Sequence, residues 1–139
     1  MIDADTMLRV FVVDDEETIA SSLAMILRLH GGIHATSFTD PLQALKLAEI
    51  EAPDLLIADV MMPQLSGIEL AIQMRLLHPN CKMLLFSGNA GTIDLLKAAR
   101  ADGFAFEFLS KPVHPAAMLA KIQDLTAPKQ AFSAQDSVP

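Results

Sequence analysis

Five short apolar runs, each followed by a segment with helical spacing, restrict the possible folds of this sequence more than any other feature. The runs cover residues 8–13, 33–38, 54–58, 82–86 and 105–109. Their density of Val, Ile, Leu and Phe is typical of strands that are buried on both faces. Strands of that kind, joined by helices, form parallel sheets with helices on both sides. The pattern therefore predicts an α/β domain built from five β–α units.

The segments between the runs carry start and stop signals of helices. Gly31-Gly32 follows the first segment, and Asp40-Pro41 supplies a cap and a first-turn proline for the second. Ser66-Gly67-Ile68-Glu69 is typical of a capping box at the start of the third. The first, fourth and fifth helices are expected over residues 16–30, 92–101 and 115–125. Each predicted strand is thus followed by a predicted helix.

Length and charge limit the organisation and the partners of the chain. Its 139 residues suit one domain, which we expect over residues 1–125, followed by a mobile polar tail over residues 126–139. With 10 basic and 17 acidic side chains, the net charge is −7, which argues against direct binding of nucleic acid. An acidic chain is better suited to divalent cations, provided that several carboxylates converge on one spot.

The sequence also indicates a compartment. Cys81 is the single cysteine, so an internal disulfide is excluded. No run approaches the roughly 20 apolar residues that a membrane helix needs. The segment Met1 to Asp5 is acidic, where a secretory signal would be basic. We therefore expect a cytoplasmic protein without a membrane partner.

Polar side chains gather at the ends of the predicted strands. In open parallel sheets, ligands bind beyond the carboxyl ends of the strands. The side chains expected at that edge are carboxylates, one hydroxyl and one ammonium, from Asp14, Asp15, Glu16, Asp59, Ser87 and Lys111. We expect them to meet at one site.

Such a group of side chains suits phosphoryl transfer. Clustered carboxylates repel one another unless a cation joins them, and oxygen ligands favour Mg²⁺. A carboxylate can attack phosphorus and form an acyl phosphate. A magnesium ion, a lysine and a small hydroxyl can each bind an oxygen of the transferred group. The composition of the site therefore predicts Mg²⁺-dependent chemistry on a phosphoryl group.

Several short motifs stand at these strand ends in a definite order. They are Asp14-Asp15, Asp59-Val60-Met61-Met62-Pro63 with Gly67, Ser87, and Lys111-Pro112. Together they resemble the receiver domains of two-component response regulators, over about residues 8–125. The resemblance implies a doubly wound, flavodoxin-like sheet of five parallel strands in the order 2-1-3-4-5. It also implies a signalling switch whose only reactions are its own phosphorylation and dephosphorylation.

The resemblance assigns a role to each matching residue of the site. Asp59 would be the phosphoacceptor, and Lys111 would pair with the phosphoryl group. Asp14 and Asp15 would hold Mg²⁺, together with Asp59 and the backbone carbonyl of Met61. The Lys111-Pro112 peptide bond is expected to be cis, as in the family. These roles come from the resemblance and not from spacing alone.

Two further residues are expected to carry the signal. Ser87 would bond the phosphoryl group after transfer, and its loop, Gly88 to Gly91, would move with it. Phe108 occupies the switch position three residues before Lys111, where the family usually has tyrosine or phenylalanine. The donor would be a histidine kinase or a phosphotransfer protein. The target would bind the face made by the fourth helix, fifth strand and fifth helix, near Ile93, Leu96, Phe106 and Phe108.

Alternative interpretations remain at this point. A magnesium-dependent phosphohydrolase of small molecules commonly places an Asp-x-Asp pair after the first strand, whereas Asp14 and Asp15 are adjacent. A degenerate receiver that only binds proteins would be expected to lack Asp59 or Lys111. Asp14 and Asp15 could also be plain helix caps, since aspartate is common at such junctions.

Overall fold

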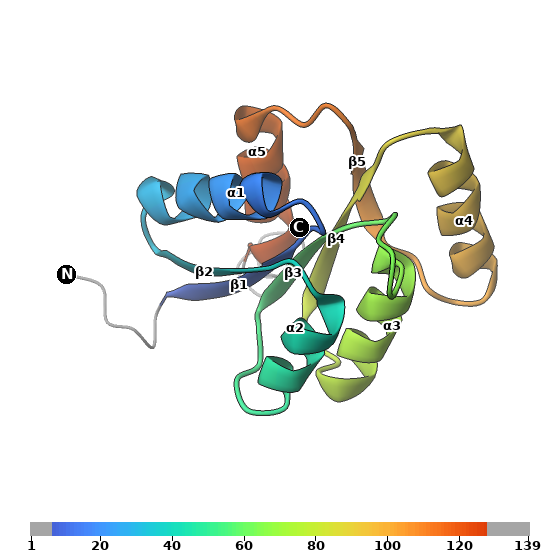
Figure 1. The fold of residues 1–139 in the computed structure, drawn as a ribbon, viewed down its shortest axis with the longest axis horizontal. Coiled ribbons are helices and arrows are strands. Elements are labelled where there is room, and N and C mark those ends of the chain that lie inside the picture. Colours follow the sequence, from blue (N-terminus) through green and yellow to red (C-terminus); the bar gives the residue numbers. More distant parts are fainter. Residues whose placement is uncertain (1–6, 128–139) are drawn as a thin grey trace, which may run out of the picture.

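The sheet consists of five parallel strands in the order β2-β1-β3-β4-β5, which confirms the predicted fold (Figure 1). The computed structural model describes residues 7–127. Its strands are β1 (Leu8–Val13), β2 (Ile33–Phe38), β3 (Leu55–Asp59), β4 (Lys82–Ser87) and β5 (Glu107–Ser110). Because β1 and β3 are neighbours in the sheet, the residues that follow β1 lie beside the end of β3.

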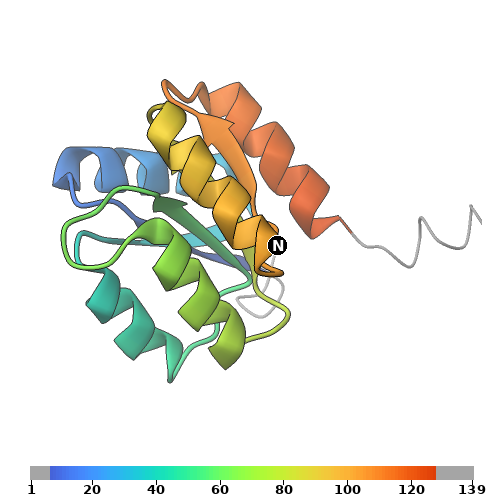
Figure 2. The same ribbon diagram turned by 90° about the vertical axis from the view of Figure 1, so that its right-hand side faces the viewer.

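Helices cover both faces of the sheet (Figures 1 and 2). They are α1 (Glu17–His30), α2 (Pro41–Ala48), α3 (Gly67–Leu77), α4 (Ala90–Ala101) and α5 (Pro115–Thr126). The helices α1 and α5 pack on one face, and α2, α3 and α4 pack on the other. Among the described residues, no helix has the length and apolar character needed to cross a membrane.

The core is formed by alternate residues of the central strands. On β1, Val10 and Val12 belong to the cluster under α1 and α5, while Phe11 and Val13 belong to the cluster under α2 and α3. This alternation follows from the two-residue period of a strand. All five residues of β3 are buried. The prediction that every strand is buried on both faces is wrong for β5, an edge strand on which three of four residues are exposed.

The start of β5 also differs from the prediction, because the strand begins at Glu107 and not at residue 105. Phe104 and Phe106 pack against the core under α3 and α4, with their ring centroids 6.3 Å apart. The guanidinium of Arg75 lies 5.1 Å from the centroid of the Phe106 ring. The apolar residues before Glu107 therefore close the end of the core and do not extend the sheet.

The C-terminal helix continues through the expected domain boundary. Helix α5 ends at Thr126, whose hydroxyl donates to the carbonyl oxygen of Ile122 at 2.7 Å. Of the predicted mobile tail, residues 128–139 lie outside the described part of the chain.

Candidate phosphoacceptor site

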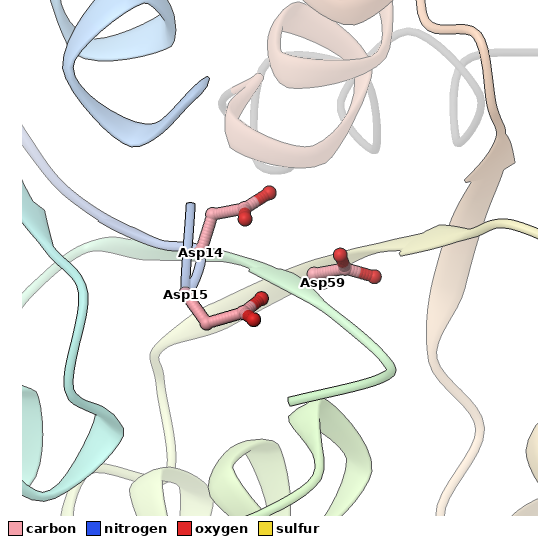
Figure 3. Close-up of side chains that lie close together, drawn as sticks. All are labelled: Asp14, Asp15 and Asp59. Carbon is pink, nitrogen blue, oxygen red and sulfur yellow. The ribbon is translucent and has the colours of Figure 1, made fainter. Parts of the chain in front are cut away.

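Three carboxylates converge where β1 and β3 end. An oxygen atom from each of Asp14, Asp15 and Asp59 lies within 4.8 Å of the others. The register of the sheet explains this convergence, since Val13 pairs with Ala58 and an aspartate follows each of these two residues in the chain. Figure 3 shows Asp14 and Asp15 extending toward the side on which Asp59 lies. The structure thus brings together three of the four carboxylates expected at this edge, while Glu16 is exposed and lies outside the group.

Asp14 is the member of this group with an unsatisfied atom. Its side chain is buried, and Oδ1 accepts a hydrogen bond from the backbone N–H of Glu16 at 2.9 Å. Its other oxygen, Oδ2, is buried without a hydrogen-bond partner. Burial raises the pKa of Asp14, and the nearby charge of Asp59 raises it further. A buried carboxylate oxygen without a partner is unfavourable unless a cation or a donor reaches it.

Asp59 is the last residue of β3 and is 8% exposed. Its Oδ2 accepts a hydrogen bond from Lys111 Nζ at 2.6 Å, and its Oδ1 accepts one from the backbone N–H of Met61 at 3.3 Å. Burial lowers the pKa of Lys111, but its hydrogen bond and attraction to Asp59, together with Asp14, outweigh this effect and raise the pKa. The ammonium of Lys111 is therefore charged near neutral pH and forms an ion pair with the carboxylate of Asp59.

The surroundings of Gly67 leave no room for a side chain, which explains the glycine in the motif after Asp59. A Cβ placed at this position would overlap the backbone carbonyl oxygen of Asp59 and press on Val60. The backbone N–H of Gly67 donates to the carbonyl oxygen of Val60 at 2.8 Å. This hydrogen bond and the close backbone contact link the start of α3 to the end of β3. They restrict the loop that follows Asp59.

Ser87 ends β4 and has a partner that the sequence analysis did not include. The hydroxyls of Ser87 and Thr92 share a hydrogen bond, and both residues are buried. Thr92 belongs to a capping box in which the Asn89 side chain accepts from the Thr92 backbone N–H at 3.0 Å. The spacing Asn-x-x-Thr was the signal for this cap. Helix α4 consequently starts at Ala90, so residues 90 and 91 belong to the helix and not to the loop that we expected from Gly88 to Gly91.

Capping differs from the prediction at α3 as well. The Ser66 hydroxyl accepts from the backbone N–H of Glu69 at 3.1 Å, as expected of a cap. The Glu69 carboxylate, however, lies 3.4 Å from the Ser66 hydroxyl, and the reciprocal bond to the backbone is not formed. The complete capping box is therefore at α4 and not at α3.

The β5–α5 connection aims Lys111 at the site. The Lys111-Pro112 peptide bond is cis, and the backbone N–H of Lys111 donates to the carbonyl oxygen of Ser87 at 2.8 Å. Phe108 pairs with Leu85 across the sheet and is 37% exposed. Met61 is also exposed, and the role of its carbonyl as a metal ligand stays a prediction.

An apolar cleft of about 420 Å³ lies beside the site. It is lined by side chains from α1, β4 and the β5–α5 connection: Ile19, Leu23, Phe86, Lys111, Pro112 and Val113. The edge of the sheet that carries the carboxylates therefore borders an apolar surface.

The carboxylate group fits a magnesium ion. It offers only oxygen ligands, which Mg²⁺ prefers, and the unpartnered Oδ2 of Asp14 supplies an atom that gains from a cation. Mutual repulsion of three nearby carboxylates is relieved by the same ion.

Comparison with known proteins agrees with this geometry. Residues 10–123 match the family described as the response regulator receiver domain. The chain belongs to this family. Receiver domains are phosphorylation-dependent switches of two-component signalling, so the resemblance drawn from the motifs is confirmed.

Relatives of this receiver domain are longer regulators. CreB, a transcriptional regulatory protein of Escherichia coli, is 30% identical over 129 residues, which cover 93% of this chain and 55% of CreB. PhoP of Bacillus subtilis, a regulator of alkaline phosphatase synthesis, is 33% identical over 115 residues, which cover 83% of this chain and 47% of PhoP. The chain spans about half the length of these relatives.

Solved receiver structures have the same fold. A receiver domain protein from Clostridium thermocellum superposes with a TM-score of 0.79 at 25% identity, covering 91% of this chain and 99% of that one. The chemotaxis protein CheY4 of Vibrio cholerae gives a TM-score of 0.75 at 26% identity, with 86% and 98% coverage.

Proposed function

We propose that Asp59 accepts a phosphoryl group from a histidine kinase or a phosphotransfer protein, and that this modification changes a protein-binding face of the domain. The observation that carries the proposal is the position of the Asp59 carboxylate. It is held by the Lys111 ammonium on one side and lies beside the acidic pair Asp14 and Asp15 on the other. A carboxylate between a fixed cation and a cation-binding pair is suited to attack an anionic phosphoryl group.

In the transfer step, a carboxylate oxygen of Asp59 attacks phosphorus and forms an acyl phosphate. The bond between phosphorus and the donor atom breaks, and its electron pair leaves with the donor. Lys111 bonds Asp59 before the reaction and is close enough to pair with a phosphoryl oxygen afterwards. Water attack on the same phosphorus would later restore the carboxylate, so the chain would catalyse only its own phosphorylation and dephosphorylation.

Asp14, Asp15 and Asp59 would hold Mg²⁺, with the Met61 carbonyl as a further ligand. When bound, the ion would offset the negative charge of the carboxylates and of the incoming phosphoryl oxygens. The unpartnered oxygen of Asp14 supports this assignment, because it has no hydrogen bond to give up.

A protein donor is favoured by the apolar cleft beside Lys111. Ile19, Leu23 and Val113 offer apolar contacts that a small phosphate ester does not need. The net charge of −7 disfavours nucleic acid as a direct partner, and we expect the domain to work in the cytoplasm without a membrane partner.

The output face would be formed by α4, β5 and α5. Its exposed apolar side chains include Leu95 and Phe108, which are 48% and 37% exposed. An ion pair of 3.2 Å between Lys121 and Glu107 joins α5 to β5 on this face. Leu96 was also expected to meet the target, but it is 6% exposed and faces the core. We therefore place the target contact on Leu95, Ile93 and Phe108.

The phosphoacceptor is tested by incubating the chain with a small phosphodonor and Mg²⁺. Intact-mass analysis should show one added phosphate, which is absent with a chelator and in Asp59→Asn. The matched control, Asp124→Asn, removes an exposed carboxylate from α5 and should be modified like the parent. An unchanged mass increase in Asp59→Asn would refute the assignment.

The output face is tested by a chemical-shift map with and without a beryllium fluoride mimic of the phosphoryl group. Shift changes should extend from the Asp59 loop to residues 87–110. Changes confined to the loop, with residues 87–110 unaffected, would show that the signal does not travel to this face.

A further inference from the structure

We propose that Thr92 is a positioning residue that holds the Ser87 hydroxyl away from the phosphoryl site and links Ser87 to the first turn of α4. The inference rests on the proposed function, because it concerns what Ser87 must give up before it can bond a phosphoryl oxygen. It starts from one contact, the hydrogen bond between two buried hydroxyls at the junction of β4 and α4.

The available protons decide the direction of this bond. Thr92 has one hydroxyl proton to donate. The carbonyl oxygen of Asn89, which can only accept a hydrogen bond, lies 2.7 Å from the Thr92 hydroxyl oxygen. The Thr92 oxygen also faces the backbone N–H of Asn89, which is a donor at 3.4 Å. With its proton directed to the Asn89 carbonyl, Thr92 accepts the proton of Ser87. Ser87 therefore donates its single proton to Thr92. The carbonyl oxygen of Asn89 lies farther from the Ser87 hydroxyl than the Thr92 hydroxyl does, at 3.2 Å.

This arrangement sets up a competition at Ser87. Phosphoryl oxygens accept hydrogen bonds but have no proton to donate when they are ionised. Ser87 can bond such an oxygen only by donating, so it must first leave Thr92. The Ser87–Thr92 bond thus opposes engagement of the phosphoryl group and favours the unmodified state by the strength of one net hydrogen bond.

The same bond connects the site to a helix end. Thr92 is the third residue of α4, and its hydroxyl and backbone N–H make up the capping box with Asn89. When Ser87 turns away, the buried hydroxyl of Thr92 loses one of its donors. Both bonds of the capping box join Asn89 and Thr92, so the cap itself would stay formed. The first turn of α4 would lose its side-chain link to the end of β4 when Ser87 bonds the phosphoryl group.

The test uses beryllium fluoride with Mg²⁺ as the phosphoryl mimic and measures its half-saturating concentration by fluorine or amide NMR. Thr92→Val keeps the shape and burial but removes the hydroxyl, so the mimic should bind about fivefold more tightly, the factor expected for one net hydrogen bond. Thr92→Ser keeps the hydroxyl and should bind like the parent. Asp40→Ala removes the cap of α2, where Asp40 accepts from Leu42 N–H, and should leave mimic binding unchanged.

A structural role for Thr92 alone would not tighten binding, which makes the sign of the effect decisive. The gain from Thr92→Val should disappear in the Ser87→Ala background, because Ser87 is the group that Thr92 restrains. Unchanged or weaker binding by Thr92→Val, or an equal gain without Ser87, would overturn the inference while the proposed function stands. Absence of binding in every variant, the parent included, would overturn the proposed function and the inference with it.

A second measurement needs no phosphoryl mimic. In a double-mutant cycle of Ser87→Ala and Thr92→Val, unfolding of the unmodified chain should show a coupling of about fivefold in the equilibrium constant. A coupling near onefold would show that the two hydroxyls do not stabilise each other. That result alone would refute the proposed role of Thr92.

Discussion

The two ends of the site differ in how well their polar atoms are satisfied. At the ends of β1 and β3, three carboxylates crowd together, and Asp14 Oδ2 is the one buried side-chain nitrogen or oxygen in residues 7–127 that lacks a partner. At the junction of β4 and α4, the buried hydroxyls of Ser87 and Thr92 bond each other and the backbone of Asn89. The acidic end leaves one buried oxygen without a hydrogen-bond partner, whereas the buried hydroxyls at the other end are satisfied within the protein.

This difference separates two tasks. The acidic end would gain from a cation, because the cation would relieve the repulsion among the carboxylates and could reach the unpartnered oxygen of Asp14. Under the proposal above, the hydroxyl end would have to break the Ser87–Thr92 bond before Ser87 could bond a phosphoryl oxygen. The acidic end would thus favour ligand binding, the hydroxyl end would oppose it, and variants at the two ends should behave differently.

The largest difference is expected from alanine at the two glycines of the site. Gly67→Ala should lower the free energy of unfolding by about 3 kcal/mol, because its Cβ overlaps the Asp59 backbone. Gly88→Ala should change it by less than about 0.5 kcal/mol, since its Cβ would meet only the flexible Lys111 side chain at 3.8 Å. Urea unfolding measures both. Equal losses in the two variants would remove this contrast.

The next effect concerns affinity for magnesium. Asp14→Ala and Asp15→Ala should each weaken Mg²⁺ binding by about tenfold or more, because a ligand and part of the attracting charge are lost. Glu16→Gln removes the same charge from an exposed side chain outside the carboxylate group and serves as the control. Calorimetric titration compares the four proteins. If all bind Mg²⁺ equally, the aspartate pair is only a helix cap.

The smallest effect is a difference in sign. Without Mg²⁺, Asp14→Asn should stabilise the chain by about 1 kcal/mol by removing a buried, crowded charge, whereas Ser87→Ala should destabilise it by about 1 kcal/mol by removing a satisfied hydrogen bond. The pKa of Asp14 is raised on folding, so its charged form opposes folding at neutral pH.

The gain in the free energy of unfolding from Asp14→Asn should therefore shrink as the pH falls through that raised pKa. Urea unfolding in chelator at several pH values checks both signs, and a destabilising Asp14→Asn at neutral pH would contradict the contrast.

The sequence was sufficient for the fold and for the acidic end of the site. The five β–α units and the convergence of Asp14, Asp15 and Asp59 depend on apolar runs and strand ends, which are local patterns. The strand order came from the resemblance to receiver domains. The hydroxyl end was predicted less well. Gly91 suggested a loop, yet the Asn89 cap allows the helix to begin before it. A glycine in the first turn weakens a helix signal without excluding the helix.

Other misses came from long-range packing. Phe106 lies in the segment predicted as the fifth strand, but it precedes the observed strand, and its ring packs with Phe104 and Arg75 against the core. Leu96 was expected at the output face, although helix rotation directs it into the core and leaves Leu95 outside. Neither the partner of a ring nor the rotation of a short helix follows from local pattern, because both depend on segments distant in sequence.

The modified residue can be located chemically, which separates Asp59 from the other acids of the cluster as the acceptor of the phosphoryl group. After treatment with a small phosphodonor and Mg²⁺, borohydride reduces an aspartyl phosphate to homoserine, and peptide mass spectrometry locates the change. We expect homoserine at position 59 only, with Asp14 and Asp15 intact. Homoserine at position 14 or 15, or a phosphorylated chain without homoserine at position 59, would contradict it.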